Sequence, residues 1–117
     1  MVKQMDIKME YRKGILFVRL IGNFHRLTYK YFNEEVFPII LKNELKYIVI
    51  NFDSLKLIDK YGIKSLEELI KINNSYKGRV TFCNLSENVK TLLENSSFKY
   101  NFFVSNDELE AVGMFEL

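Results

Sequence analysis

Two kinds of apolar spacing alternate along this chain of 117 residues, and their order limits the folds that it can adopt. In the short runs at residues 15–21 and 47–52 nearly every side chain is apolar or β-branched, which is typical of strands covered on both faces. In the longer segments that begin at Tyr29 and Asp59, apolar residues recur every three or four positions, which predicts amphipathic helices. Strands that alternate with helices predict a mostly parallel sheet with helical cover.

The first two predicted strands form a hairpin. In residues 7–12 apolar and charged side chains alternate, a period of two that suits a strand with one face in water. Lys13 and Gly14 supply a tight turn into the second strand, residues 15–21, which is expected to stop at Gly22. The fold therefore begins with two antiparallel strands.

The segment after this hairpin is predicted to be a helix, with Thr28 as its N-cap. Pro38 lies inside the helical pattern and has no N–H to donate to the carbonyl of Glu34. Two interpretations follow: one helix that is kinked at Pro38, or two shorter pieces.

The remaining elements continue the alternation. After the strand at 47–52 we expect a loop over residues 53–58, and Asp59 then caps a helix that ends at residues 73–75. The later elements are strands at 79–83 and 101–104, a helix capped by Ser86 and a short helix opened by Asp107, with Ser105 and Asn106 as its possible caps. The predicted fold class is therefore α/β in the order ββαβαβαβα: a mixed, mostly parallel sheet of about five strands covered by helices, in one domain over residues 1–117.

The inventory of reactive residues argues against an enzyme. His25 is the only histidine and Cys83 the only cysteine. Cys83 lies in an apolar strand and is expected to be buried, whereas His25 follows a strand end in a loop. These two residues are too few for a metal site of the His and Cys type, and the five glycines stand apart, so that no phosphate-binding loop can be written. We expect no cofactor, no metal and no catalysis.

Charge and hydropathy exclude two further classes. Seventeen basic and fifteen acidic residues give a formal net charge of +2, which is too small to indicate a nucleic-acid-binding protein. The apolar runs are far shorter than the roughly 20 residues that a membrane-spanning helix needs, and the first residues lack an apolar signal core. We therefore expect a cytoplasmic protein with no membrane span.

Residues 48–63 resemble, without gaps, the central signature of the STAS domain family, which includes the bacterial anti-sigma factor antagonists. That signature is an apolar strand, an Asp-Leu-Ser-like turn, an apolar pair and then Asp-Ser-Ser-Gly-Leu leading into a helix. Asp59, Gly62 and Ile63 match its last element. Upstream, residues 18–24 resemble the family's second strand. Together with the order of the elements, the resemblance covers nearly the whole chain and implies a STAS-like fold.

The same resemblance implies a protein-binding module. Antagonists of this family bind a kinase-like anti-sigma factor and so release the sigma factor, and phosphorylation of the first Ser in Asp-Ser-Ser-Gly blocks that binding. Here Lys60 stands in the place of that Ser, and Tyr61 in the place of the next one. Because a lysine cannot accept phosphate by this chemistry, the usual Ser switch is absent, and we do not transfer it to Tyr61.

The resemblance also implies where a partner binds: at the turn before the predicted helix, at the start of that helix, and at the neighbouring loop. The expected partner-binding residues are Ser54, Leu55, Lys56, Asp59, Lys60, Tyr61, Gly62, Ile63, His25 and Arg26. The expected partner is a kinase-like anti-sigma factor or another signalling protein.

Other interpretations stay open. The chain is an antagonist that phosphorylation does not turn off, or a relative whose partner recognises Lys60 and Tyr61 directly. Alternatively it is an accessory or sensory STAS subunit of another system, such as a lipid-transport or signalling complex, or a small-molecule-binding module, because an open α/β sheet offers crevices at its strand ends. The plainest interpretation of Lys60 and Tyr61 is a solvated helix start without a partner.

Overall fold

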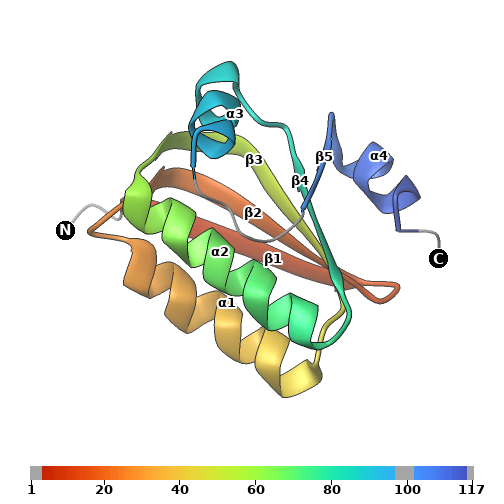
Figure 1. The fold of residues 1–117 in the computed structure, drawn as a ribbon. Helices are drawn as coiled ribbons and strands as arrows, with labels where there is room; N and C mark the ends of the chain where they lie inside the picture. Colours follow the sequence, from red (N-terminus) through yellow and green to blue (C-terminus); the bar gives the residue numbers. More distant parts are fainter. Residues whose placement is uncertain (1–3, 97–101, 116–117) are drawn as a thin grey trace.

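The computed structural model describes residues 4–96 and 102–115, which contain five strands and four helices (Figure 1). The strands are β1 (Met5–Arg12), β2 (Ile15–Phe24), β3 (Tyr47–Ile58), β4 (Arg79–Cys83) and β5 (Phe103–Ser105). The helices are α1 (Tyr29–Asn43), α2 (Lys60–Ser75), α3 (Glu87–Glu94) and α4 (Glu108–Gly113). The order ββαβαβαβα predicted from the sequence is confirmed.

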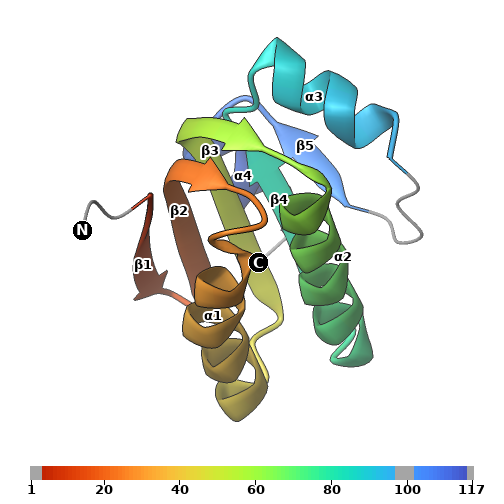
Figure 2. The same ribbon diagram turned by 90° about the vertical axis from the view of Figure 1, so that its left-hand side faces the viewer.

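All five strands belong to one sheet, in which they lie side by side in the order of the chain. β1 pairs with β2 antiparallel, and the other three strand pairs are parallel. α1 and α2 lie along one face of the sheet, whereas α4 packs on the other face (Figures 1 and 2). The predicted α/β class, a mixed and mostly parallel sheet with helical cover, is therefore confirmed.

Helices on both faces explain why β2 and β3 are apolar without alternation. Leu16 and Val18 of β2 are buried in the larger core, which also contains the buried side chains of α1 and α2. Phe17 of β2 and Val49 of β3 pack instead in a smaller cluster with Ala111 of α4. Full burial of an apolar side chain of this size stabilises a fold by about 1.5–3 kcal/mol, so both clusters contribute to holding the sheet.

Charged groups attach α4 to the sheet in addition to apolar contacts. Arg19 of β2 donates from Nε and Nη2 to the two carboxylate oxygens of Glu108, each at 2.8 Å. Asn51 Nδ2 donates to Glu108 Oε2 at 2.8 Å, and Glu10 Oε1 accepts from Arg19 Nη1 at 3.0 Å. The pKa of Glu108 lies below its ordinary value, and the hydrogen bond from Arg19 is the largest cause of this shift.

The third strand is longer than the sequence pattern predicts, and the expected loop over residues 53–58 is wrong. β3 continues to Ile58 because β2 also continues, to Phe24, and supplies backbone partners for it. The register between the two strands shifts at two places, and at each of them β3 has one residue more than β2. Such β-bulges bend a strand and turn side chains outward, which accounts for the polar, turn-like sequence of this part of β3.

Gly22 allows β2 to run past the point where the sequence predicts its end. Its φ is +92°, in the region that side chains other than glycine adopt at a cost. A Cβ at this position would overlap the carbonyl oxygen of Gln4 in the chain that leads into β1. Glycine at position 22 therefore allows the backbones of β1, β2 and β3 to lie close together.

α1 runs through Pro38 as one helix, so the interpretation as two pieces is wrong. Pro38 and Glu34 are both exposed, and water can therefore replace the donor that the Glu34 carbonyl lacks. Thr28 occupies the N-cap position, as predicted, but its side chain makes no capping hydrogen bond to the helix.

The last strand is also displaced from its predicted bounds of 101–104. β5 is Phe103–Ser105, and Asn101 lies outside the described residues. Asp107 is the N-cap of α4, and its side chain accepts the N–H of Glu110 at 2.8 Å. The predicted final helix is present, but Asp107 itself is its cap, in place of the possible caps Ser105 and Asn106, because its carboxylate reaches the backbone of the first turn.

We predict that Gly22→Ala lowers the free energy of unfolding by at least about 2 kcal/mol, because it combines backbone strain with overlap. Two other glycines serve as controls. Gly14→Ala has a positive φ of +84° but open space around the new methyl group, and it should cost about 1 kcal/mol. Gly113→Ala has neither problem and should be close to neutral. Urea unfolding measures all three, and equal costs at positions 22 and 14 would contradict the role of the Gln4 contact.

A second prediction concerns pH. The folded-state pKa of Glu108 lies below its ordinary value of 4.5, so ionised Glu108 stabilises the fold above pH 4.5, and this contribution is lost as the pH falls below it. Because the ion pair with Arg19 is partly exposed, we expect Glu108→Gln to lower the free energy of unfolding at neutral pH by only about 1 kcal/mol. The same variant should lose less stability on acidification than the wild type. Glu110→Gln, on the same helix, is the control, and identical acid profiles for wild type and Glu108→Gln would contradict the prediction.

Candidate functional site

The carboxyl ends of β2 and β3 meet the start of α2 at one end of the sheet. Phe24 and Ile58 are register partners, and both are buried. The next residue along the chain, Asp59, donates its backbone N–H to the carbonyl of Phe24 at 3.1 Å. The two strands therefore remain bound to each other up to the residue at which the helix is capped.

The Asp59 carboxylate holds this junction together. Its Oδ1 accepts the backbone N–H groups of Tyr61 at 2.8 Å and Gly62 at 3.2 Å, which confirms the predicted N-cap. Its Oδ2 accepts the backbone N–H of Arg26 at 3.1 Å, from the connection between β2 and α1. One side chain thus satisfies three backbone donors from two segments that are far apart in sequence.

Gly62 is required by close packing. It is buried, and a Cβ there would lie 2.6 Å from the carbonyl oxygen of Phe24 and 2.8 Å from Cγ1 of Ile58. The first turn of α2 can therefore rest directly on the ends of the two strands. The match of Gly62 to the family signature has this geometric reason.

The connection from β2 to α1 is held by its own short-range bonds. Thr28 Oγ1 donates to the carbonyl of Asn23 at 2.7 Å and accepts the N–H of His25 at 2.9 Å. His25 Nδ1 accepts the N–H of Leu27 at 3.1 Å, so the neutral imidazole carries its proton on Nε2. His25 is partly exposed and serves here to shape the loop.

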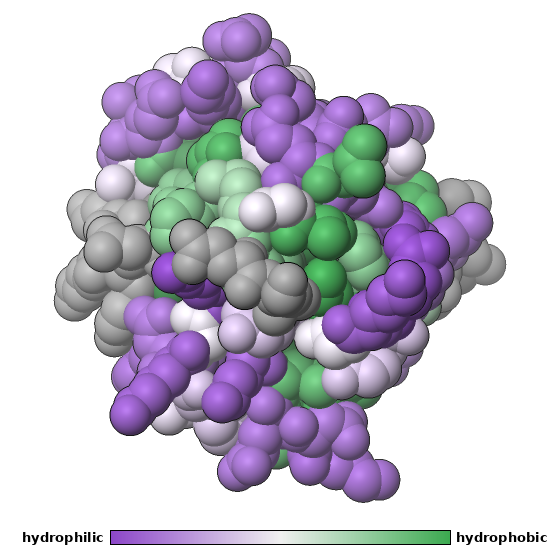
Figure 3. All heavy atoms as spheres, turned by 90° about the vertical axis from the view of Figure 1, so that its right-hand side faces the viewer, coloured by the Kyte–Doolittle hydropathy of each residue, from purple (hydrophilic) through white to green (hydrophobic). Residues whose placement is uncertain are grey.

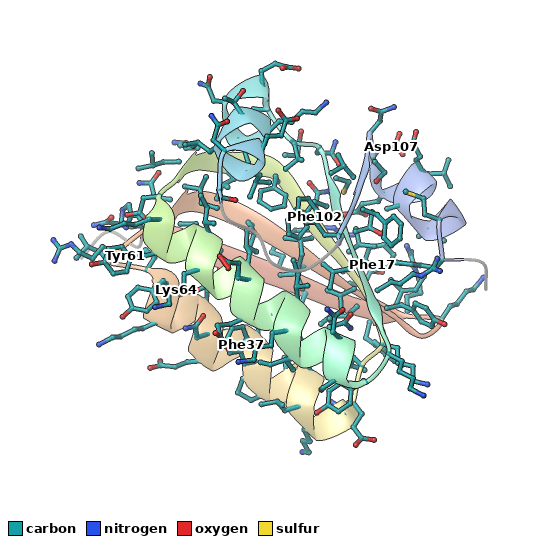
Figure 4. The ribbon with its side chains drawn as sticks, viewed as in Figure 1. Phe17, Phe37, Tyr61, Lys64, Phe102 and Asp107 are labelled. Atoms are coloured by element: carbon teal, nitrogen blue, oxygen red, sulfur yellow. The ribbon has the colours of Figure 1, made fainter. Side chains whose placement is uncertain are left out.

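Lys60 and Tyr61, which the sequence resemblance predicts to stand in the place of the family's two serines, differ in their environment. Lys60 is exposed, and its Nζ lies 5.6 Å from the centre of the Tyr61 ring. Tyr61 is half-buried, with its ring 5.3 Å from that of Tyr29 on α1. In Figure 4 Tyr61 lies at the start of α2 beside α1, with Lys64 one turn further along. Neither side chain is packed inside the core.

The predicted partner-binding residues therefore come together at one end of the sheet, although Ser54, Leu55 and Lys56 belong to β3 and not to a turn. The β-bulges also expose a residue that the sequence analysis missed, because Leu57 follows Lys56 on the outside and is 49% exposed. Leu27, beside Arg26, is 64% exposed and was missed as well. Leu27 could have been found in the sequence, because an apolar residue in a predicted loop indicates an exposed apolar side chain.

We call this set the junction surface. Its members are the ten predicted residues, His25, Arg26, Ser54, Leu55, Lys56, Asp59, Lys60, Tyr61, Gly62 and Ile63, together with Leu27 and Leu57. Among them Gly62 is buried and acts through backbone geometry alone.

A groove continues from the junction surface along α2. Its volume is about 690 Å³, and it lies between α2 and the end of α3, with Lys60, Ile63 and Leu92 among its lining residues. Both acidic and basic side chains of α2 line it, including Glu67 and Lys71. The mixture of charged and apolar groups suits contact with a protein surface better than enclosure of a small apolar molecule.

A second concave surface lies at the opposite end of the sheet, around α4. Its volume is about 590 Å³, and Phe17, Leu109 and Val112 contribute its apolar lining. Figure 3 views the face of the molecule that carries α4 and β5 and shows apolar side chains gathered in its middle, with hydrophilic ones around them. Leu109 is 83% exposed. Figure 4 shows Phe17 and Asp107 on this side of the molecule, away from Tyr61.

The described residues offer little reactive chemistry. Burial raises the pKa of Cys83 to about 12, so its thiol is un-ionised at neutral pH and is a poor nucleophile. Residues 4–96 and 102–115 contain no group of three or more His, Cys, Asp or Glu side chains that could hold a metal ion. In the same part of the chain no helix is long and apolar enough to cross a membrane.

Comparison with known proteins agrees with this architecture. The model of the STAS domain family matches residues 6–111. A protein named anti-sigma F factor antagonist, from Paenibacillus polymyxa, is 24% identical over 113 residues, which are 97% of this chain and 97% of that one.

Solved structures show the same fold. An anti-sigma factor antagonist from Mycobacterium paratuberculosis superposes with a TM-score of 0.85 at 12% identity, over 97% of this chain and 95% of that chain. The anti-sigma factor antagonist SpoIIAA in its unphosphorylated form gives a TM-score of 0.76 at 17% identity, over 95% of this chain and 98% of that chain.

We predict that Asp59→Ala lowers the free energy of unfolding by about 1–2 kcal/mol, because three backbone donors lose their acceptor. Asp59→Asn is the matched variant: it keeps an oxygen acceptor and should cost distinctly less. Urea unfolding measures both. Equal losses for the two variants would show that the capping hydrogen bonds are not what Asp59 contributes.

Proposed function

This chain belongs to the STAS domain family, and we propose that it acts as a non-enzymatic anti-sigma factor antagonist that binds a kinase-type anti-sigma factor through the junction surface. The observation that carries the proposal is the match to a protein named as an antagonist, with 97% of each chain aligned. In this proposal the bound anti-sigma factor no longer holds its sigma factor.

The chemistry of the junction surface supports protein binding. Leu27 and Leu57 offer exposed apolar contacts, and the cationic side chains of Arg26, Lys56 and Lys60 lie in the same surface. The one carboxylate among the twelve residues of the junction surface, that of Asp59, is already bound to three backbone N–H groups. The surface therefore favours a partner with apolar side chains bordered by acidic ones.

The absence of a hydroxyl at position 60 supports control by a route other than Ser phosphorylation. The N-terminal turn of a helix favours an anion, so a phosphate on a serine at this position would be stabilised locally and would still disrupt a desolvated interface. Lys60 instead places a cation there, at a cost of about 0.3–1 kcal/mol to the helix. We propose that this cost is retained because Lys60 contacts the partner.

We predict that Lys60→Glu weakens binding to the anti-sigma factor at least about tenfold, which is about 1.4 kcal/mol, by reversing a charge in the interface. Tyr61→Ala and Leu57→Ala should weaken binding to a similar degree, because each removes apolar contact area. Isothermal titration of each variant with the kinase-type anti-sigma factors of the same genome measures the affinities.

Lys46→Glu is the control for charge. Lys46 is exposed and directly precedes β3, at the opposite end of the strand from the junction surface. Its variant makes the same change in net charge and should bind like the wild type. The proposed surface is wrong if Lys60→Glu and Tyr61→Ala both leave the affinity unchanged, and the proposed function is wrong if the wild type binds none of these anti-sigma factors.

A further inference from the structure

No strand or helix within residues 4–96 and 102–115 covers the outer side of β1. β1 is the first strand of the sheet, and among the described strands it pairs with β2 alone; Figure 2 shows no helix of the described chain beside its outer edge. Its eight residues, Met5–Arg12, keep one unbroken register with β2 and include no proline. Edge strands in natural proteins are usually shortened, bulged or covered, because an exposed edge binds other strands.

Two hydrogen bonds show which backbone groups of β1 face outward. Asn23 donates its N–H to the carbonyl of Gln4 at 2.9 Å, which places the hydrogen bonds to β2 on the even-numbered residues. In agreement, the N–H of Ile7 is not used by β2 and donates to Asp6 Oδ1 at 2.9 Å. The N–H and C=O groups of Ile7, Met9 and Tyr11 therefore point away from the sheet.

The charges of β1 are arranged with opposite signs about Met9. Lys8 and Glu10 are each one residue from Met9, and Asp6 and Arg12 are each three residues from it. An antiparallel copy of the same strand, centred on Met9, would place each cation directly across from an anion. Opposite charges directly across a strand pair are stabilising.

We propose that β1 pairs antiparallel with β1 of a second copy of this chain, centred on Met9, and joins two five-stranded sheets into one continuous sheet. This inference rests on the strand edge and does not depend on the proposed function. Lys8 then faces Glu10 of the second copy, and Asp6 faces its Arg12. Both pairs occur twice because the interface has two-fold symmetry.

The hydrogen-bonding pattern permits this register. Met9 faces Met9, and Ile7 faces Tyr11 of the second copy, as hydrogen-bonded pairs made by the outward groups. Lys8 and Glu10 then form a non-hydrogen-bonded pair, in which side chains approach most closely. The Ile7 N–H exchanges its bond to Asp6 for the carbonyl of Tyr11 across the interface.

Neighbouring registers of the same parity are disfavoured by charge. A pairing centred on Lys8 places Lys8 across from itself and Asp6 across from Glu10 of the second copy. A pairing centred on Glu10 places Glu10 across from itself and Lys8 across from Arg12. Like charges directly across a strand pair are destabilising, so the charge pattern selects the register centred on Met9.

Apolar contacts on the α1 side of the sheet also stabilise the proposed interface between the two β1 strands, which we call the seam. Ile7 and Met9 are partly buried against the main core, and Tyr11 is 61% exposed. Tyr11 also lines a concavity of about 360 Å³ with Ile39 of α1 and Leu45. In the pair, Ile7 of one copy covers Tyr11 of the other and removes apolar surface from water.

The two copies leave the junction surface accessible. A two-fold axis through the seam makes β2 of one copy run opposite to β2 of the other, so the carboxyl ends of these strands point in opposite directions. Each dimer would then present two junction surfaces, at opposite ends of the joined sheet.

The first test is the mass of the wild-type chain in solution. Sedimentation over a range of concentrations should show the mass rising from that of one chain, 13.9 kDa, toward twice that value. A single-chain mass at every concentration, including the highest that the protein tolerates, would overturn the proposal.

The second test exchanges charges. Each of two single variants, Lys8→Glu or Glu10→Lys, places like charges across the seam. Each should lower the affinity of self-association at least tenfold. An equimolar mixture of the two variants restores opposite charges in both pairs and should recover the dimer. Because Glu10→Lys also removes a 3.0 Å contact to Arg19, thermal unfolding must show that this variant is folded. A mixture of folded variants that stays at single-chain mass would overturn the proposed register.

A cysteine pair gives a readout that does not depend on Glu10. Hydrogen-bonded antiparallel partners have Cα atoms about 5.5 Å apart, which a disulfide can span. Met9→Cys should therefore form a covalent dimer under mild oxidation, in a chain whose own Cys83 is buried. Ile7→Cys is the control: it does not face itself and should cross-link only when mixed with Tyr11→Cys. Equal cross-linking of Met9→Cys and Ile7→Cys alone would overturn the register.

Discussion

The structure of the junction surface depends on the parallel pairing of β2 and β3 up to Phe24 and Ile58. Because this pairing continues to the last residue of both strands, the helix start at Asp59 has a fixed position on the sheet. The Asp59 carboxylate then joins the start of α2 to the loop before α1 through backbone hydrogen bonds. A surface built in this way is preorganised, so that little free energy would be spent on ordering this surface when a partner binds.

The other end of the sheet is held by a different balance of forces. α4 is a helix of six residues, too short to be stable alone, and its position depends on what it contacts. Ala111 and the following Phe115 supply apolar contacts, while Glu108 binds Arg19 of β2 on the same face of the sheet. Partial exposure of this ion pair limits its contribution, so the apolar cluster determines most of the stability and the ion pair fixes the orientation.

The sequence predicts what is determined locally. Strand and helix order follows from the period of the apolar residues, and the caps at Asp59 and Ser86 follow from short-range hydrogen bonding. The error at residues 53–58 has a non-local cause: a polar segment became a strand because β2, which Gly22 allows to continue, offered it partners. The exposure of Leu57 depends on the bulges in that pairing, and no local pattern encodes them. The single helix through Pro38 likewise depends on an exposed position that the pattern alone did not decide.

Within the junction surface the residues that build the geometry differ from those available for recognition. Asp59 accepts hydrogen bonds from backbone amides, and Gly62 allows close packing of the helix start on the strand ends. Both residues match the family signature. Lys56, Leu57 and Lys60 are exposed, so their side chains contribute little to the packing of the fold. Lys60 therefore presents a cation at the start of α2 without taking part in the packing of the fold. Because the residues that build this geometry are separate from the exposed side chains, a substitution at position 60 can change the charge and the hydrogen-bonding groups of the junction surface without changing the backbone that presents them.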